Sequence, residues 1–421
     1  MKRHLQLATL LMGAAIAAAA CSGGAATSAP AASEAPASEA PASEAPASEA
    51  PAGGLSGSIT LWHSYGSGGG EGTAFNEALD AVKAANPELT VEVVEQPFDQ
   101  LFNKWRTDVA AGGGADMFIA PNDSLGQDAR EQSIMNLDDF LAGNPALEGY
   151  LPVSIDGSKV DGSFYMVPES LKAVAMWYDK SKVANPPTTS DELLAAVKDG
   201  SVTIGINQGV YHQFGWTGAF GGQLMDDTGA CTADDGGFAD AFAYLKELKD
   251  AGATFNTDGN ALKTAFQTGE INTIIDGPWQ TADFRTALGE NLAVAPIPAG
   301  PAGPANPFTG TDGWYINPNL DTEQAQLAVD LALALTSAES QQIMVDGAGH
   351  VPVDPSVTIT DPITQGFADA AAAGLPRPQN AQFNNWWGPF GDALNKVIDT
   401  GADPSTAVAE ACTLMDEASG L

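Results

Sequence analysis

Residues 59–62 (ITLW), 91–94 (VEVV) and 117–120 (MFIA) are three short apolar runs bounded by turn residues. Between them, residues 75–82 and 98–109 carry apolar side chains at helical spacing. A strand–helix–strand–helix–strand order predicts a mainly parallel sheet with helices on both faces, because parallel strands need crossover connections.

A second set of elements begins near Pro168. Residues 174–178, 202–206 and 271–275 are predicted strands, and residues 238–248 carry a clean helical stripe. The chain has 421 residues, more than one hydrophobic core usually organises, so we expect two α/β lobes. With no long linker between them, the chain is expected to cross more than once. Open α/β sheets bind ligands beyond the carboxyl ends of their strands, which predicts a site in the cleft between the lobes.

Two helix starts are predicted from their capping residues. Thr336 and Glu339 fit a capping box that opens a helix near Ala338. Asp403 is expected to cap a helix whose first residue is Pro404.

The beginning of the chain predicts export. Basic residues 2–4 precede the almost uncharged run 5–20, which is too short to span a bilayer of about 30 Å. The run ends in small residues before Cys21 and resembles a bacterial lipoprotein cleavage box, which implies a signal peptide over residues 1–20 and a lipid on Cys21. An ordinary cleaved signal peptide is the alternative. Residues 21–54 are predicted to be a disordered Ala/Ser/Glu/Pro spacer, because four tandem copies of Ala-Ser-Glu-Ala-Pro offer almost nothing to bury.

The net charge bears on the binding partners of the chain, and the cysteines bear on its stability. The 17 Lys and Arg against 53 Asp and Glu give a net charge of −36, which opposes binding to nucleic acid or anionic lipid. A solvated acidic coat is the simplest reading, with adaptation to salt as an alternative. Cys231 and Cys412 either pair, which stabilises by roughly 4–5 kcal/mol in the loop-entropy model, or remain free thiols.

Motifs for catalysis, metals and cofactors are missing. The sequence has no H-E-x-x-H, C-x-x-C, Walker A or G-x-S-x-G pattern, and after the leader its histidines are the scattered His63, His212 and His350. No metal, cofactor or enzymatic activity is therefore expected. Carboxylates are abundant enough that a glycosidase-like pair can always be imagined, so a secreted glycoside-active enzyme stays as an alternative.

Tryptophans point to a ligand class. Trp105 and Trp177 fit predicted core stripes, whereas the other six stand at strand ends, turns or irregular segments: Trp62, Trp216, Trp279, Trp314, Trp386 and Trp387. A sugar offers an apolar C–H face and a rim of hydroxyls, which suits flat aromatic rings beside carboxylates and amides. For any single Trp, packing is about as plausible as ligand contact.

Five stretches together resemble family 1 of the extracellular solute-binding proteins of ABC importers, which includes the maltose/maltodextrin-binding protein. They are residues 59–62, 114–123, 174–180, 269–279 and 333–339, in the order that the family has. The resemblance implies a type II periplasmic-binding-protein fold, with a ligand cleft between two lobes. The N-terminal lobe is expected over residues 55–167 and 309–353, and the C-terminal lobe over 168–308 and 354–421.

The resemblance also implies a set of ligand contacts. Trp279 corresponds to a stacking platform, Asp123 to a carboxylate that accepts sugar hydroxyls, and either Trp386 or Trp387 to a late stacking tryptophan. The chain departs from the charged contacts of the maltose binder at two places: Glu71 could substitute for a charged pair after the first strand, and Lys172 replaces a glutamate contact. These departures put maltose itself in doubt. The full candidate set is Trp62, Ser64, Glu71, Asn122, Asp123, Lys172, Tyr211, Trp279, Trp386 and Trp387.

We therefore expect a monomeric, lipid-anchored protein outside the cell membrane that captures a sugar by hinge closure. Its expected partners are the sugar or oligosaccharide, the ABC permease subunits and the membrane through Cys21, with no nucleic acid. A solute-binding protein for a non-sugar ligand is the other alternative. Scarce Arg residues argue against an anion as that ligand.

Overall fold

The computed structural model of the chain describes residues 54–66 and 69–421. The predicted leader, Cys21 and nearly all of the predicted spacer lie outside these residues. Within the described part, no helix combines the length and apolar character that a membrane crossing requires.

The first sheet has seven strands and contains the three apolar runs. β1 pairs in parallel with β2 on one side and with β3 on the other, as the strand–helix alternation predicts. The strands are β1 (Gly57–His63), β2 (Leu89–Glu95), β3 (Met117–Pro121), β6 (Val167–Lys172), β12 (Phe308–Ile316), β13 (Val351–Pro352) and β14 (Leu375–Pro376). A separate hairpin joins β4 (Lys159–Val160) to β5 (Ser163–Phe164).

The first sheet is mixed rather than mainly parallel, which corrects the prediction. β12 lies antiparallel to both β3 and β6, and β13 lies antiparallel to β6. The reason is connectivity: β12 returns from the second sheet, without the crossover helix that sets direction in the first three strands.

The second sheet has five strands, in the order β11-β7-β10-β8-β9. Their bounds are β7 (Ala175–Asp179), β8 (Ile204–Asn207), β9 (Thr254–Asn256), β10 (Thr273–Asp276) and β11 (Leu292–Ala295). The predicted strands at 174–178, 202–206 and 271–275 are confirmed as β7, β8 and β10, with shifted ends. We call the parts of the chain built on the first and second sheets lobe 1 and lobe 2.

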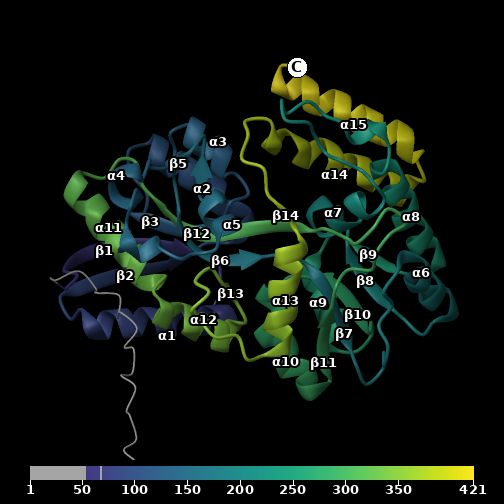
Figure 1. Cartoon of the computed structure of the whole chain (residues 1–421), viewed down its shortest axis with the longest axis horizontal. Helices are drawn as coiled ribbons and strands as arrows, with labels where there is room; N and C mark the ends of the chain where they lie inside the picture. Colours follow the sequence, from purple (N-terminus) through teal and green to yellow (C-terminus); the bar gives the residue numbers. More distant parts are fainter. Residues whose placement is uncertain (1–53, 67–68) are drawn as a thin grey trace, which may run out of the picture. The chain divides into compact units, whose positions relative to one another are not determined.

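Helices cover both faces of the first sheet (Figure 1). Leu61 of β1 packs with Phe75 in the cluster that holds α1, α11 and α12, whereas its neighbour Trp62 points to the opposite face and packs with α2. The helices of lobe 1 are α1 (Gly70–Ala85), α2 (Phe98–Ala110), α3 (Leu125–Arg130), α4 (Asp138–Leu141), α5 (Pro152–Asp156), α11 (Thr322–Leu335) and α12 (Ala338–Ala348).

Lobe 2 carries the remaining long helices, and α14 and α15 lie side by side at its outer edge (Figure 1). They are α6 (Ser190–Asp199), α7 (Val210–Ala219), α8 (Phe238–Ala251), α9 (Gly259–Gln267), α10 (Thr281–Leu288), α14 (Trp387–Asn395) and α15 (Pro404–Ser419). Short 3-10 turns are η1 (Pro145–Leu147), η2 (Ala233–Asp235), η3 (Pro278–Gln280), η4 (Gly289–Asn291) and η5 (Phe383–Trp386), and η6 (Lys396–Thr400) is a π-helical turn. α13 (Pro362–Ala373) packs on strands of both sheets.

The chain passes from the first sheet to the second after Lys172 and returns after Ala295, and after Pro376 it continues into α14 and α15 of lobe 2. The predicted boundary at Pro168 falls inside β6, which pairs with β12 and β13 of the first sheet. The first passage therefore lies a few residues later, between β6 and β7. Because the chain passes more than once, the two lobes are joined by several short segments instead of one linker.

The helix caps differ in one case from the prediction. Asp403 caps α15, its side chain accepting a hydrogen bond from the Thr406 N–H, as predicted. The predicted capping box at Thr336 is wrong by one residue, because Ser337 caps α12 and accepts from the N–H of Ser340.

Cys231 and Cys412 form a disulfide across a sequence separation of 181 residues. It joins the loop before η2 to α15, so the pairing left open by the sequence is resolved. The bridge fastens the C-terminal helix to the body of lobe 2.

Candidate functional site

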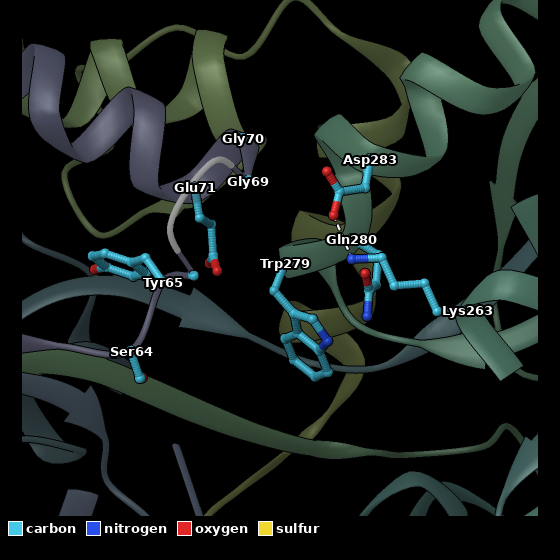
Figure 2. A pocket seen from close by; sticks show the side chains of 10 residues that line it. Ser64, Tyr65, Gly69, Gly70, Glu71, Lys263, Trp279, Gln280 and Asp283 are labelled. Carbon is cyan, nitrogen blue, oxygen red and sulfur yellow. Dashed lines mark hydrogen bonds and ion pairs between the residues drawn. The ribbon is translucent and has the colours of Figure 1, made fainter. Parts of the chain in front are cut away.

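A cavity of about 390 Å³ lies between elements of the two lobes. Figure 2 shows Trp279 in its centre, with Tyr65 and Glu71 on one side and Gln280, Lys263 and Asp283 on the other. Its remaining lining residues are Ser64, Gly66, Gly69 and Gly70. The cavity is thus bounded by the loop that joins β1 to α1 and by the turn that follows β10.

The turn after β10 places Trp279 by local geometry. Pro278 is the first residue of η3, where its fixed φ suits the start of a helical turn. At Gly277, a Cβ atom would stand only 2.0 Å from the Trp279 ring. Only glycine therefore lets the indole fold back against the chain and face the cavity.

Five ionisable side chains form a buried network in lobe 1, which we call the charged cluster: Glu71, Glu169, Lys172, Asp312 and His350. Lys172 Nζ lies 2.9 Å from carboxylate oxygens of both Glu71 and Asp312. The His350 ring nitrogens lie 2.8 Å from Glu71 Oε1 and 3.0 Å from Glu169 Oε1. Glu71 is the member that lines the cavity, and its cluster partners hold its carboxylate in position.

Pairing outweighs burial for Glu71, His350 and Lys172; it also lowers the pKa of Glu169 against burial, whereas burial raises the pKa of Asp312. Burial would raise the pKa of Glu71, but Lys172 and His350 lower it to about 2. Burial would lower the pKa of His350, but Glu169 and Glu71 raise it to about 9. Burial would likewise depress the pKa of Lys172, and its carboxylate partners instead raise it. All three groups are consequently charged near neutral pH.

Two aromatic side chains of lobe 2, which we call the aromatic pair, face the charged cluster: Tyr211 of α7 and Trp279. Their ring centroids are 6.3 Å apart, with 33° between the ring planes. Lys172 Nζ stands 5.9 Å from the Trp279 ring centroid, within reach of a cation–π contact. Both rings keep part of their surface exposed.

A second polar group gathers around Arg377, which follows β14. The Arg377 guanidinium forms an ion pair with Asp123 and donates a hydrogen bond of 3.1 Å to Asn122 Oδ1. Asn122 also donates to the Gly157 carbonyl and accepts from the Thr311 N–H, so its buried amide is occupied by protein partners. Asn122 thus holds the loop after β3 in place, which differs from its predicted ligand contact.

Two tryptophans of the predicted contact set, Trp62 and Trp386, lie in the core. Trp62 is 5 % exposed and packs edge-on against Trp105 at a centroid distance of 5.9 Å. Trp386 is 1 % exposed and packs among aromatic side chains that include Phe308. Both are corrected to packing residues, because strand alternation turns Trp62 toward α2 and the turn η5 points Trp386 inward.

The other predicted residues fall into three groups. Ser64, Glu71 and Trp279 line the cavity, and Tyr211 and Lys172 contact its lining residues. Asp123 stands beside Arg377 instead. Trp387 keeps part of its surface exposed and packs on Trp386, 4.5 Å away between centroids.

Sequence reasoning missed several side chains of the site. Tyr65 lines the cavity opposite Trp279, and its position directly after Ser64 was a usable signal. His350 and Asp312 had no such signal, because they come from the segment between α12 and β13 and from the middle of β12, far along the chain from Glu71. For Arg377, the sequence offered no signal beyond the scarcity of arginine.

The arrangement suits a neutral polar ligand. Two partly exposed rings supply flat apolar surfaces, and Glu71, Asp283, Ser64 and Gln280 supply acceptors and donors for hydroxyl groups. Within the described residues, no three His, Cys, Asp or Glu side chains are placed to hold a metal ion.

The model of the bacterial extracellular solute-binding proteins matches residues 77–373 of the chain. The maltooligosaccharide ABC transporter solute-binding lipoprotein of Streptococcus pneumoniae R6 is 25 % identical, over 80 % of this chain and 85 % of its own. The galactooligosaccharide-binding protein of Bacillus subtilis is 24 % identical over the same shares. Among solved structures, the maltose/maltodextrin-binding domain of Bdellovibrio bacteriovorus bound to maltotriose superposes with a TM-score of 0.78, at 21 % identity, covering 86 % of this chain and all of that one.

Proposed function

Because the chain belongs to the bacterial extracellular solute-binding proteins, we propose that it is the substrate-binding protein of a carbohydrate ABC importer. The observation that carries the proposal is the cavity between the lobes, where Trp279 faces Tyr65 and Glu71. The related proteins named for maltooligosaccharides and galactooligosaccharides support an oligosaccharide as the ligand class.

The proposed mechanism is closure of the lobes around the sugar. One face of the sugar stacks on the aromatic pair of lobe 2, while hydroxyls reach Glu71 and Ser64 of lobe 1. A ligand that touches both lobes binds the closed arrangement more tightly than an open one and shifts the population toward it. The permease subunits then recognise the closed form. No covalent bond changes in this cycle.

Calorimetric titration of the mature protein with maltose, maltotriose, maltotetraose and galactooligosaccharides tests the proposal. We expect one series to bind, with a decrease in radius of gyration on binding measured by small-angle X-ray scattering. No binding by any of these sugars would contradict it. Incubation with the bound sugar, followed by chromatography, tests the enzymatic alternative, and we expect the sugar to be recovered intact.

We propose further that Cys21 carries a lipid and that residues 22–54 hold the body away from the membrane. The support is the lipoprotein-like box before Cys21 and the lipoprotein among the relatives. Metabolic labelling with a tagged fatty acid is expected to mark the wild type. Cys21→Ser, which cannot accept the thioether-linked lipid, is expected to remain unlabelled, and a labelled variant would contradict the anchor.

A further inference from the structure

The space between the lobes has two unlike ends. At one end lies the cavity around Trp279, whose lining includes none of Asn122, Asp123, Tyr211 or Arg377. At the other end stands Arg377, only 5 % exposed although its side chain is long and charged. The two ends are linked by the aromatic pair, because Tyr211 lies near both Trp279 and Arg377.

Arg377 is held on several sides. Its guanidinium carbon stands 5.3 Å from the Tyr211 ring centroid in lobe 2, and the guanidinium is paired with Asp123 in lobe 1. It also lies against the backbone of β12, since a Cβ atom at Gly310 would come within 3.0 Å of both terminal nitrogens. The planar group therefore bridges a side chain of lobe 2 and a carboxylate of lobe 1.

A neutral sugar is poorly equipped to displace this side chain. The Asp123 carboxylate and the Arg377 guanidinium are joined by a charge-assisted interaction, which is roughly twice as strong as a hydrogen bond between neutral groups. If a sugar hydroxyl replaced Arg377 beside Asp123, the Arg377 guanidinium would also lose its carboxylate partner in a buried setting. Arg377 is accordingly expected to stay in place when ligand binds.

We infer that Arg377 forms an end wall of the sugar site and so limits the length of the oligosaccharide. The inference rests on the proposed function and deepens it. The cavity of about 390 Å³ lies near the lower end of the range for small-ligand sites, which favours a short saccharide.

The dependence of affinity on the length of the oligosaccharide tests whether Arg377 forms an end wall. Calorimetric dissociation constants are measured for a series from the disaccharide to the hexasaccharide, using maltodextrins or galactooligosaccharides, whichever the wild type binds. For the wild type, affinity is expected to stop rising with length once the cavity is filled. For Arg377→Ala, longer members are expected to gain about tenfold relative to the disaccharide, corresponding to about 1.4 kcal/mol of new contact.

Two further variants make the outcome decisive. Asp123→Asn combined with Arg377→Ala removes both charges, so that no unpaired carboxylate remains if the single variant folds poorly, and it is expected to show the same gain. Arg285→Ala is the matched control, because Arg285 forms its ion pair with Asp361 and does not line the cavity. Its length profile is expected to equal that of the wild type.

The results separate the inference from the function. Equal weakening for all lengths in Arg377→Ala and in the double variant would mean that Arg377 only positions Asp123, and the end wall would be wrong. Wild-type affinity that keeps rising to the hexasaccharide would also overturn it. A wild type that binds no oligosaccharide of either series would instead contradict the proposed function.

Discussion

The charged cluster of lobe 1 and the aromatic pair of lobe 2 face the same space but are built in opposite ways. Each carboxylate of the cluster is matched within the protein, so that Glu71 reaches the cavity already held by Lys172 and His350. The aromatic pair packs against the core of lobe 2 on one side and keeps part of each ring exposed. Lobe 1 thus offers a preorganised polar surface, and lobe 2 offers an uncovered apolar one.

Because of this difference, the charged cluster is expected to matter mainly for stability and the aromatic pair mainly for binding. Removing a member of the charged cluster leaves a buried charge unpaired, which the folded state must bear whether or not ligand is present. Removing a ring of the aromatic pair mainly takes away surface that only the ligand would cover. The two regions are therefore expected to respond differently to substitution.

The largest effect is expected for Lys172→Met. It leaves Asp312 without its cation and Glu71 with His350 alone, and should lower the free energy of unfolding by about 3–5 kcal/mol in urea denaturation. Lys396→Met is the control, because the exposed Lys396–Glu410 pair contributes no more than about 1 kcal/mol. A loss below about 1 kcal/mol for Lys172→Met would break the contrast between the two regions.

The pH dependence of stability sharpens the same contrast. His350 has a pKa raised from 6.5 to about 9, so its contribution is complete below pH 6.5 and is lost as the pH rises through 9. Glu71 has a pKa lowered from 4.5 to about 2, so its contribution is complete above pH 4.5 and is lost as the pH falls through 2. Both are complete between pH 4.5 and 6.5, and His350 accounts for at most about 3 kcal/mol.

Urea denaturation from pH 5 to 10 measures the alkaline side of this dependence. In His350→Gln the decline attributed to His350 is expected to disappear, whereas His212→Gln is expected to retain it. An unchanged decline in His350→Gln would show that the charged cluster is not its source.

Trp279→Ala is expected to act on binding. Loss of a partly exposed ring that faces the ligand should weaken affinity by about 2 kcal/mol, or roughly thirtyfold, with little change in the urea midpoint. Trp62→Ala provides the opposite case, with about 3–5 kcal/mol lost in stability because Trp62 is in the core. Folded Trp62→Ala protein is expected to retain affinity, and the reverse assignment of the two effects would refute the site.

The smallest effect is expected for Tyr211→Phe. The change keeps the ring, so affinity should alter by less than about 0.5 kcal/mol, or about twofold. Tyr211→Ala, which removes the ring, should weaken binding more. A large loss in Tyr211→Phe would mean that the hydroxyl, and not the ring, contacts the ligand.

Much of the fold could be predicted because its signals are local. The runs at 59–62, 91–94 and 117–120 became β1, β2 and β3, since strand and helix periods are visible within a few residues. The mixed direction of the first sheet was missed, because β6 and β12 pair across more than a hundred residues. No local pattern records which way a returning strand runs.

The site was predicted only in part, for a similar reason. Trp279, Ser64 and Glu71 were predicted from the family resemblance, and all three line the cavity. Trp62 and Trp386 stood in the predicted contact set but pack in the core, because the sequence does not record which way a tryptophan near a strand end or in a turn points. The face is settled by what packs there, as Trp105 does against Trp62.

The sequence by itself determined the alternation of strands and helices, the number of lobes and the chemical character of the site, since composition and periodicity are properties of neighbouring residues. Tertiary structure decided which charges meet, placing Glu71, Lys172 and His350 together from three distant segments, and it decided that Arg377 faces Asp123. Such pairings depend on the direction and register of whole elements. They become visible only when the chain has folded back on itself.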